Sequence, residues 1–449
     1  MASLLIGNVY TEEQNGDPAQ LSAHQKLVAC AKSQRMLWFA QSGDIAILPM
    51  PPSTAFLTYI ATIVDFDIHT VSVAIPPSGQ AGVHILTGDR LIDPVFLRDL
   101  RRQVVARDII EVLPYFTDTA SASLVRALDV ADALPGADFF SQGGAILSNS
   151  KALFRCVAAG IGIPIAAGET VQTPERAERA IVTLLDEGYS VIVKQDRQSS
   201  GEGNLILSAD PNVHAHGAVS ATRINTPGEV TTFLTHHWGW LSNNNSSTVV
   251  VERFIEQARS VYAEYMVTDE AITFLGDGEL LMEPILSGVV VPATCLSDVE
   301  QLTLHEATRR LCQSYQAIGY RGIMSVDAVV SPTGEVFVHE TNNRLSGATY
   351  LHQVFAARIT GPNRVILDRE GWTVPSFDTA LRTLIDSGLA FDFTTRRGVI
   401  ITADSTAVDG TLRYIAVGVD LEDAYRLDSR LKALRAPVER EEVPIAASH

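Results

Sequence analysis

Glu340, Asn342 and Arg344 occupy alternate positions in the stretch VFVHETNNRLSG, residues 336–347. In an extended chain, alternate side chains point to the same face. A carboxylate, an amide and a guanidinium are costly to bury without partners, so such a face is a poor way to fill a core. We therefore expect this face to hold a ligand.

These residues end a predicted β-hairpin, residues 322–347, whose first strand carries Asp327 and whose turn is SPTG. Antiparallel pairing brings Asp327 near Glu340, and two such carboxylates repel each other unless a positive charge lies between them. Mg²⁺ carried by nucleotide phosphates, with its preference for oxygen ligands, is the usual solution. An ion pair between Glu340 and Arg344 is the simpler alternative, but it leaves Asp327 and Asn342 unexplained.

Lysine is rare in this chain, so each lysine is less often mere surface filler. The five lysines among the 34 basic residues are Lys26, Lys32, Lys151, Lys194 and Lys432. Lys151 falls in the first turn of a predicted helix, where the helix dipole disfavours a cation unless an anion lies nearby. A solvated side chain is the simpler alternative for Lys151.

Lys194 ends the predicted strand SVIVK and precedes a loop that is rich in serine and glycine, residues 198–204. A lysine and several backbone N–H groups in such a loop can surround phosphates. We expect this loop to be mobile without nucleotide, because its residues resist a fixed backbone geometry. An ordinary hairpin is the alternative, since the loop has neither the GxGxxG nor the GK[ST] motif.

A third segment, residues 247–267, has two β-rich runs around ERFIEQARS. Its first strand ends at Glu252, and connectors of this kind can present backbone groups to an adenine edge. If this segment is considered alone, a plain β-hairpin is the simpler interpretation.

The composition of the whole chain indicates a soluble globular enzyme. The 449 residues are 46% hydrophobic and 19% charged, and the net charge of −18 argues against a nucleic-acid partner. The four cysteines lack CxxC spacing, which suggests ordinary thiols in a reducing compartment. No apolar run reaches membrane-spanning length and the N-terminus lacks a signal-peptide pattern, so we expect a cytoplasmic protein without a membrane partner.

The chain divides into three predicted parts. Residues 1–140 alternate strands with helices, as in residues 93–106 where Asp93 is a candidate N-cap, and indicate a mostly parallel α/β domain. Residues 141–372 carry the segments described above, and residues 373–449 have their own pattern of α+β elements.

The ordered set of a lysine before a helix, a strand–lysine–glycine loop, the ERFI connector and a D…ExNxR hairpin resembles the ATP-grasp superfamily over residues 148–347. The resemblance implies an α/β chain in which a pre-ATP-grasp domain precedes an ATP-grasp fold of two α+β subdomains. It also implies ATP and Mg²⁺ as cofactors. In this superfamily a carboxylate attacks ATP, and an amine then attacks the resulting acyl phosphate.

Carried over residue by residue, the resemblance implies a role for each polar position. The phosphates would be contacted by Lys151 and Lys194 and covered by a loop with Ser200, Gly201 and Gly203. The adenine would be met by the Glu252 side chain and by backbone groups of Arg253 and Ile255. Mg²⁺ would be bound by Asp327, Glu340 and Asn342. The catalytic residues would be Arg344, Lys194 and, as a second oxyanion partner, Arg397. Asp327 stands where glutamate is frequent in the carboxylase branch, and the loop has more serine than usual, so the branch stays open.

The whole-chain layout is similar to that of the pheganomycin-type peptide ligases of actinobacteria. This similarity implies that the carboxylate of a guanidino amino acid is joined to the amine of a peptide in antibiotic biosynthesis. The acidic surface would attract such a cation. The expected substrate-pocket residues are Glu283, Ser346 and Gly347.

Two alternatives remain. One is another ATP-grasp ligase for dipeptides or small metabolites, and the other is a regulatory protein that holds ATP without turnover. A biotin-dependent carboxylase fits less well, because nothing suggests a carrier domain. The substrates and the oligomeric state stay open, with a homodimer among the expected states.

Overall fold

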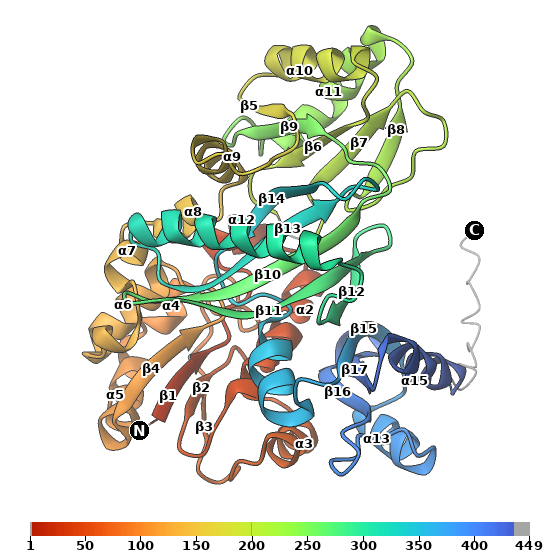
Figure 1. The fold of residues 1–449 in the computed structure, drawn as a ribbon. Helices are drawn as coiled ribbons and strands as arrows, with labels where there is room; N and C mark the ends of the chain where they lie inside the picture. Colours follow the sequence, from red (N-terminus) through yellow and green to blue (C-terminus); the bar gives the residue numbers. More distant parts are fainter. Residues whose placement is uncertain (1, 199, 435–449) are drawn as a thin grey trace, which may run out of the picture.

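The computed structural model describes residues 2–198 and 200–434. Ser199, which belongs to the predicted loop, and residues 435–449, which end the predicted C-terminal part, lie outside the described residues. Three sheets with four, five and eight strands organise the chain (Figure 1). No helix in the described ranges is both long enough and apolar enough to cross a membrane.

The N-terminal part is the predicted parallel α/β layer. Its sheet has the order β3-β2-β1-β4, with parallel pairs throughout, and its strands are β1 (Ala2–Ile6), β2 (Ile45–Ile47), β3 (Ser72–Ala74) and β4 (Ile109–Pro114). Helices on this layer include α2 (Ala23–Ser33), α3 (Thr54–Val64), α5 (Pro94–Arg107) and α6 (Thr119–Leu128). The Asp93 carboxylate accepts hydrogen bonds from two N–H groups of α5, which confirms the predicted N-cap.

The second sheet forms a separate lobe, at the top of Figure 1, with two helices on its outer face. Its strands, in the order β5-β9-β6-β7-β8, are β5 (Gly168–Val171), β9 (Val249–Arg253), β6 (Val191–Gln195), β7 (Asn204–Ser208) and β8 (Ser220–Arg223). The covering helices are α10 (Pro174–Asp186) and α11 (Pro227–Leu241). Val191 and Val193 belong to the core under these helices, so the alternate residues Ile192 and Lys194 are left to the inner face.

The third sheet joins the central and C-terminal parts. Its order is β14-β13-β10-β11-β12-β15-β17-β16, with antiparallel pairs throughout. The first five strands are β14 (Val336–Asn342), β13 (Gly322–Val330), β10 (Arg259–Val267), β11 (Ile272–Met282) and β12 (Leu286–Val291). The last three are β15 (Val365–Thr373), β17 (Thr411–Gly418) and β16 (Gly398–Ser405). The predicted boundary at residue 372 therefore falls at the end of a strand, and the C-terminal strands extend the central sheet.

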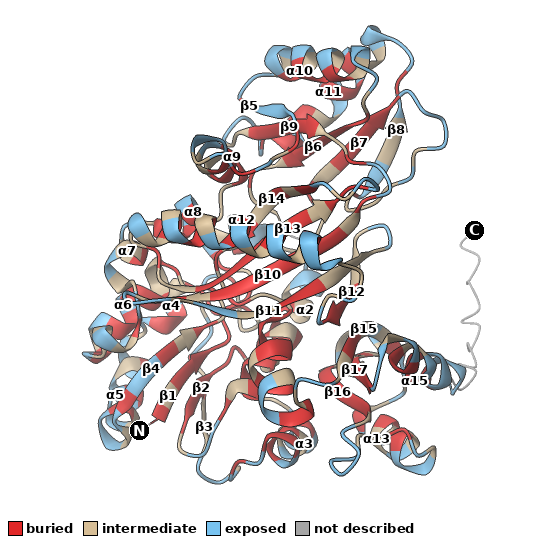
Figure 2. Cartoon of the chain, viewed as in Figure 1, coloured by how far each residue is buried: buried red, intermediate tan, exposed pale blue. Residues whose placement is uncertain are grey.

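The helices around this sheet are α12 (Asp298–Ala317), the π-helix η4 (Leu351–Thr360), α13 (Phe377–Asp386) and α15 (Leu421–Ala433). The amphipathic helix α12 lies along the strands with one buried face and one exposed face (Figure 2).

The first and last parts of the chain share a hydrophobic core. The Trp38 indole N–H donates to the Thr402 carbonyl at 2.8 Å, and the Trp38 ring lies 4.9 Å from that of Phe355. The Ile401 N–H donates to the Tyr59 hydroxyl at 3.1 Å. Side chains that are distant in sequence therefore meet at the junction of the three parts.

Candidate active site

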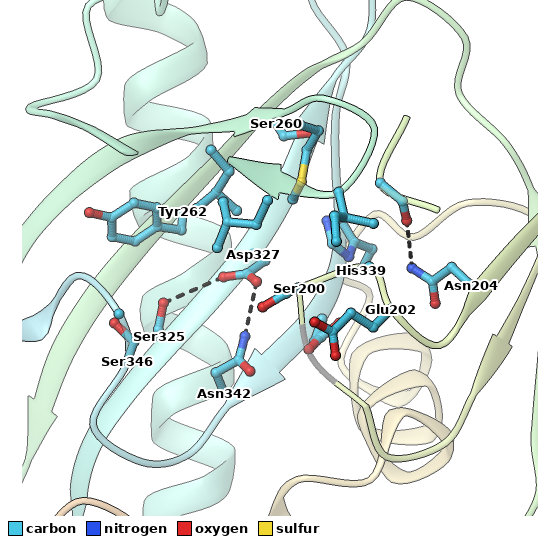
Figure 3. A pocket seen from close by; sticks show the side chains of 18 of the residues that line it. Ser200, Glu202, Asn204, Ser260, Tyr262, Ser325, Asp327, His339, Asn342 and Ser346 are labelled. Carbon is cyan, nitrogen blue, oxygen red and sulfur yellow. Dashed lines mark hydrogen bonds between the residues drawn. The ribbon is translucent and has the colours of Figure 1, made fainter. Parts of the chain in front are cut away.

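A cavity of about 250 Å³ lies at this junction and takes wall residues from all three parts of the chain. Most of the predicted site residues line it, namely Lys194, Ser200, Gly201, Glu252, Arg253, Ile255, Asp327, Glu340, Asn342, Arg344, Ser346 and Gly347. Figure 3 shows Asp327, Asn342 and His339 from the hairpin converging with Ser200 and Glu202 from the loop. The elements therefore bring together side chains spread over about 150 positions.

The hairpin of β13 and β14 places Asp327 directly opposite Glu340. The Asn342 amide donates to Asp327 Oδ2 at 2.9 Å, and Arg344 Nη1 donates to Asn342 Oδ1 at 2.6 Å. Burial, and then repulsion by Glu340, raises the pKa of Asp327 well above its ordinary range. The pair is thus short of positive charge, as the sequence indicated.

These residues fit a divalent cation. Asp327 and Glu340 supply two carboxylates, the hard ligands that Mg²⁺ prefers, and Asn342 would add its amide oxygen on giving up the bond from Arg344. Within residues 2–198 and 200–434, no group of three or more His, Cys, Asp or Glu side chains is arranged to hold a metal. A cation here would therefore depend on other oxygen ligands, such as the phosphates of a nucleotide.

Lys151 opens helix α9 (Lys151–Gly160), which Ser150 caps by accepting the Leu153 N–H at 3.1 Å. Its Nζ lies 3.4 Å from Glu340 Oε2 and donates to the Gln198 carbonyl at 2.6 Å. Lys151 lines a smaller pocket next to the main cavity, and Glu340 is shared by the two. The anion expected near this lysine is thus, in part, the Glu340 carboxylate.

Lys194 and Glu252 form a buried ion pair with each other on the inner face of the second sheet. Arg155, one turn after Lys151 on α9, pairs with the same Glu252 carboxylate. Two cations share this one carboxylate, so the buried cluster carries a net positive charge, and its members Lys194 and Glu252 line the cavity. Arg155 was missed in the sequence, although its spacing of four from Lys151 puts the two residues on one helix face.

The cavity also has an apolar slot in its wall. Ala166, Ile255 and Ala258 form a small buried cluster with Val329 and Phe337 packed against it. The Arg253 guanidinium lies over the Tyr189 ring at 4.3 Å, and its backbone N–H donates to Ala167. A flat apolar ligand such as a base would fit this slot.

The loop after β6 reaches the cavity through Ser200, Gly201 and Glu202. Gly201 has φ +83°, and a Cβ there would lie 2.9 Å from the Gly217 backbone. Gly203 does not line the cavity, and its carbonyl accepts the Gln195 N–H. The glycine at 201 is therefore required by a close approach, whereas the predicted contact of Gly203 with phosphates has no support in its position.

Besides Lys151 and Gly203, two more predicted residues, Arg397 and Glu283, do not line the cavity. Arg397 donates two hydrogen bonds to the Asp423 carboxylate, at 2.7 and 2.8 Å. The next residue, Gly398, pairs with Val417 near the end of β17. The β17 residue that lines the cavity is Arg413, which lies near the start of that strand. The prediction of Arg397 as an oxyanion partner has no support in its position, because its guanidinium is paired with Asp423.

Glu283 is exposed in the turn after β11, and it does not line the cavity. The residues on either side of this turn, Met282 and Ile285, do line it. The predicted role of Glu283 in the substrate pocket therefore has no support in its position and stays a prediction.

Several wall residues were missed in the sequence, namely Tyr10, Lys32, Arg35, His339 and Arg413. His339 is half-buried, its Nδ1 has no hydrogen-bond partner, and burial lowers its pKa. The rarity of lysine was a signal for Lys32, since three of the five lysines line the two pockets.

Known proteins share this architecture. A family model described as Pre ATP-grasp domain matches residues 33–130, and one described as PGM1 C-terminal domain matches residues 379–431. A curated relative, phosphoribosylamine–glycine ligase of Synechocystis sp., is 25% identical over 217 residues. That match covers 45% of this chain and 46% of the relative, so less than half of the relative's length is matched.

Solved structures match over almost the whole chain. The N5-carboxyaminoimidazole ribonucleotide synthetase of Thermus thermophilus is 13% identical with a TM-score of 0.55, covering 98% of this chain and 100% of that one. Biotin carboxylase of Campylobacter jejuni, solved as a beta-gamma-ATP complex, is 12% identical with a TM-score of 0.53. That match covers 94% of this chain and 89% of the carboxylase chain. The chain therefore has the ATP-grasp fold of these enzymes, preceded by a pre-ATP-grasp domain.

Proposed function

We propose that the protein is an ATP-dependent carboxylate–amine ligase that releases ADP and phosphate. The observation that carries the proposal is the hairpin Asp327–Glu340–Asn342–Arg344, which faces the same cavity as Lys194 and the loop at Ser200. An ATP-binding regulatory protein would need the nucleotide slot but not this convergence of carboxylates and cations.

The position of each cavity residue suggests which part of the reactants it would contact. The nucleotide base would enter the slot beside Ile255, and Lys194 and Lys151 would face the phosphates. Asp327, Glu340 and Asn342 would hold Mg²⁺, which neutralises phosphate charge when bound. Arg344 lines the cavity next to them, where it would stabilise oxyanions of the acyl phosphate and of the tetrahedral intermediate.

We extend the proposal to the substrates that the whole-chain layout suggested, a guanidino amino acid as the acid and a peptide as the amine, joined in antibiotic biosynthesis. Glu202 is an exposed residue of the cavity wall without an ion pair in the described ranges, and it would face a guanidinium. The matched PGM1 C-terminal domain occupies the same region behind the ATP-grasp fold that this layout requires.

A second candidate is an ATP-grasp ligase for a small metabolite. The synthetase of Thermus thermophilus favours it, because its whole length is covered by this chain. In both candidates, the first products are ADP and phosphate.

The test is ATP turnover against a panel of carboxylic acids and amines, with nucleotides separated by chromatography. We expect ADP and phosphate to appear only when both an acid and an amine are present, together with a coupled product. AMP and pyrophosphate in stoichiometric yield would refute an acyl phosphate and indicate adenylation. Nucleotide binding without turnover for any pair would support the regulatory alternative.

A further inference from the structure

Two cations line the cavity without a carboxylate partner. Lys32 lies near the end of α2, and Arg35 follows in the 3-10 turn η2 (Gln34–Phe39). Within the described ranges, neither side chain forms an ion pair, and the polar contact of Lys32 Nζ is with the Tyr10 hydroxyl at 3.4 Å. Both residues come from the N-terminal part, outside the ATP-grasp fold.

Arg35 is the more unusual of the two. It is only 8% exposed, and its Nε is buried without a hydrogen-bond partner. An unpaired buried guanidinium is costly, so folding alone does not explain it. Burial, and then the nearby Arg35, lowers the pKa of Lys32, which is the effect expected of two cations held close together.

The other charged groups of this wall are Arg413, Glu370 and Glu202. Arg413 donates to the Asp368 carboxylate at 2.9 Å and to Glu370 at 3.0 Å. Two carboxylates on one guanidinium leave a single negative charge, and Lys32 and Arg35 add two positive ones. The exposed Glu202 of the same wall offsets the remaining positive charge, so Lys32 and Arg35 are distinguished by their lack of a carboxylate partner and not by an excess of positive charge.

The geometry points to Lys32 and Arg35 as a docking site for an anionic group, a carboxylate or a phosphate, on the substrate that shares the cavity with the nucleotide. The site rests on the proposed function, because the cavity must also hold ATP. A peptide would dock through its terminal carboxylate, and a metabolite through a carboxylate or phosphate. The Tyr10 hydroxyl would donate to the same group.

The test is calorimetric titration of the full chain saturated with Mg²⁺ and a non-hydrolysable ATP analogue, so that the phosphate-binding end of the nucleotide site is filled. The titrants are inorganic phosphate, diglycine and amidated diglycine. We expect at least one anion to bind and amidated diglycine to bind more weakly than diglycine by roughly tenfold or more. The anion that binds more tightly identifies the source of the group.

Lys32→Met should weaken anion binding by roughly tenfold or more, and Lys32→Arg should retain it. Lys26→Met, in the same helix but outside the cavity wall, is the matched control and should bind like the parent chain. Arg35→Met should lose binding as well, without a fall in the denaturation midpoint, because an unpaired cation is removed. A structural role for Arg35 would instead lower that midpoint.

Absence of binding by either anion at about 10 mM, or equal binding by parent and Lys32→Met, would overturn the site. Analogue affinity and ADP release are measured on the same proteins. Anion binding without any ADP release would count against the ligase and leave the anion site standing. An unchanged rate of ADP release in Lys32→Met and Arg35→Met would count against the anion site alone.

Discussion

Asp327 and Glu340 face each other across one hairpin, and the charge balance around them decides what the site can bind. Glu340→Gln removes one of the two carboxylates while keeping the shape of the side chain. We expect a folded protein whose rate of ADP formation falls by on the order of 10²–10³, because phosphate charge is no longer neutralised. Glu335→Gln, an exposed change before the same strand, is the control and should keep the parent rate. Near-normal turnover by folded Glu340→Gln would remove the metal assignment.

Arg344 and Arg397 provide a second comparison at the scale of single residues. Arg344 lines the cavity and its Nε is buried without a partner, whereas Arg397 is tied to Asp423. We expect Arg344→Met to lower turnover by about 10²-fold or more. Arg397→Met should keep the parent turnover and lower the free energy of unfolding by at most about 1 kcal/mol, since the pair is partly exposed. Steady-state assays and urea titrations measure both, and a loss of turnover in Arg397→Met would reinstate its predicted role.

The loop after β6 has a constrained backbone geometry at Gly201, where it meets the cavity. Gly201→Ala puts a Cβ against the Gly217 backbone at a positive φ, so the loop must shift. We expect a clear loss of turnover with a loss of stability of about 1 kcal/mol. Gly188→Ala, at φ +85° with no atom within 4 Å of its Cβ, carries the same backbone strain away from the cavity. It should lose similar stability and keep full turnover, and equal turnover in both variants would show that the loop does not act on the nucleotide.

Local sequence patterns predicted the helices and strands, whereas long-range packing determined which distant side chains meet at the cavity. The Asp93 cap, the strand before Lys194 and the hairpin with Asp327 opposite Glu340 depend on neighbouring residues, so the sequence was enough for them. Arg397 could not be placed in this way, because its partner Asp423 lies 26 positions later and on another element. Arg35 and Arg413 meet one cavity from opposite ends of the chain, and no spacing rule connects them.

Buried carboxyl groups affect the stability of the whole molecule. Burial raises the pKa of Glu13 and of Glu264 to about 7 and that of Asp118 to about 6. A carboxyl group with a raised pKa in the folded state stabilises the fold below its unfolded pKa, and this contribution is lost as the pH rises through the folded pKa. These three carboxyl groups therefore favour the fold at pH 5 over pH 8, whereas His339 and His352, whose pKa values burial lowers, act in the opposite direction.

Glu264→Gln tests this dependence. Glu264 Oε1 accepts from the Ser346 and Thr349 hydroxyls at 2.7 and 2.8 Å, and a glutamine oxygen can accept both bonds. A pKa raised from 4.5 to about 7 corresponds to about 3 kcal/mol. We expect the difference in unfolding free energy between pH 5 and pH 8 to shrink by up to this amount in the variant. Glu270→Gln, exposed near the end of the same strand, is the control, and an unchanged pH dependence in Glu264→Gln would contradict the assignment.

The hydrogen bond from Trp38 to Thr402 has a consequence for the folding of the chain during its synthesis. During synthesis, the ribosome delivers the N-terminal wall of the cavity hundreds of residues before Arg413, so the cavity stays open until the last strands of the large sheet emerge. Contacts of such long sequence separation are slow to form. The N-terminal wall of the cavity therefore stays uncovered until the C-terminal strands are made, whereas the residues proposed to hold the nucleotide are all made before Arg413.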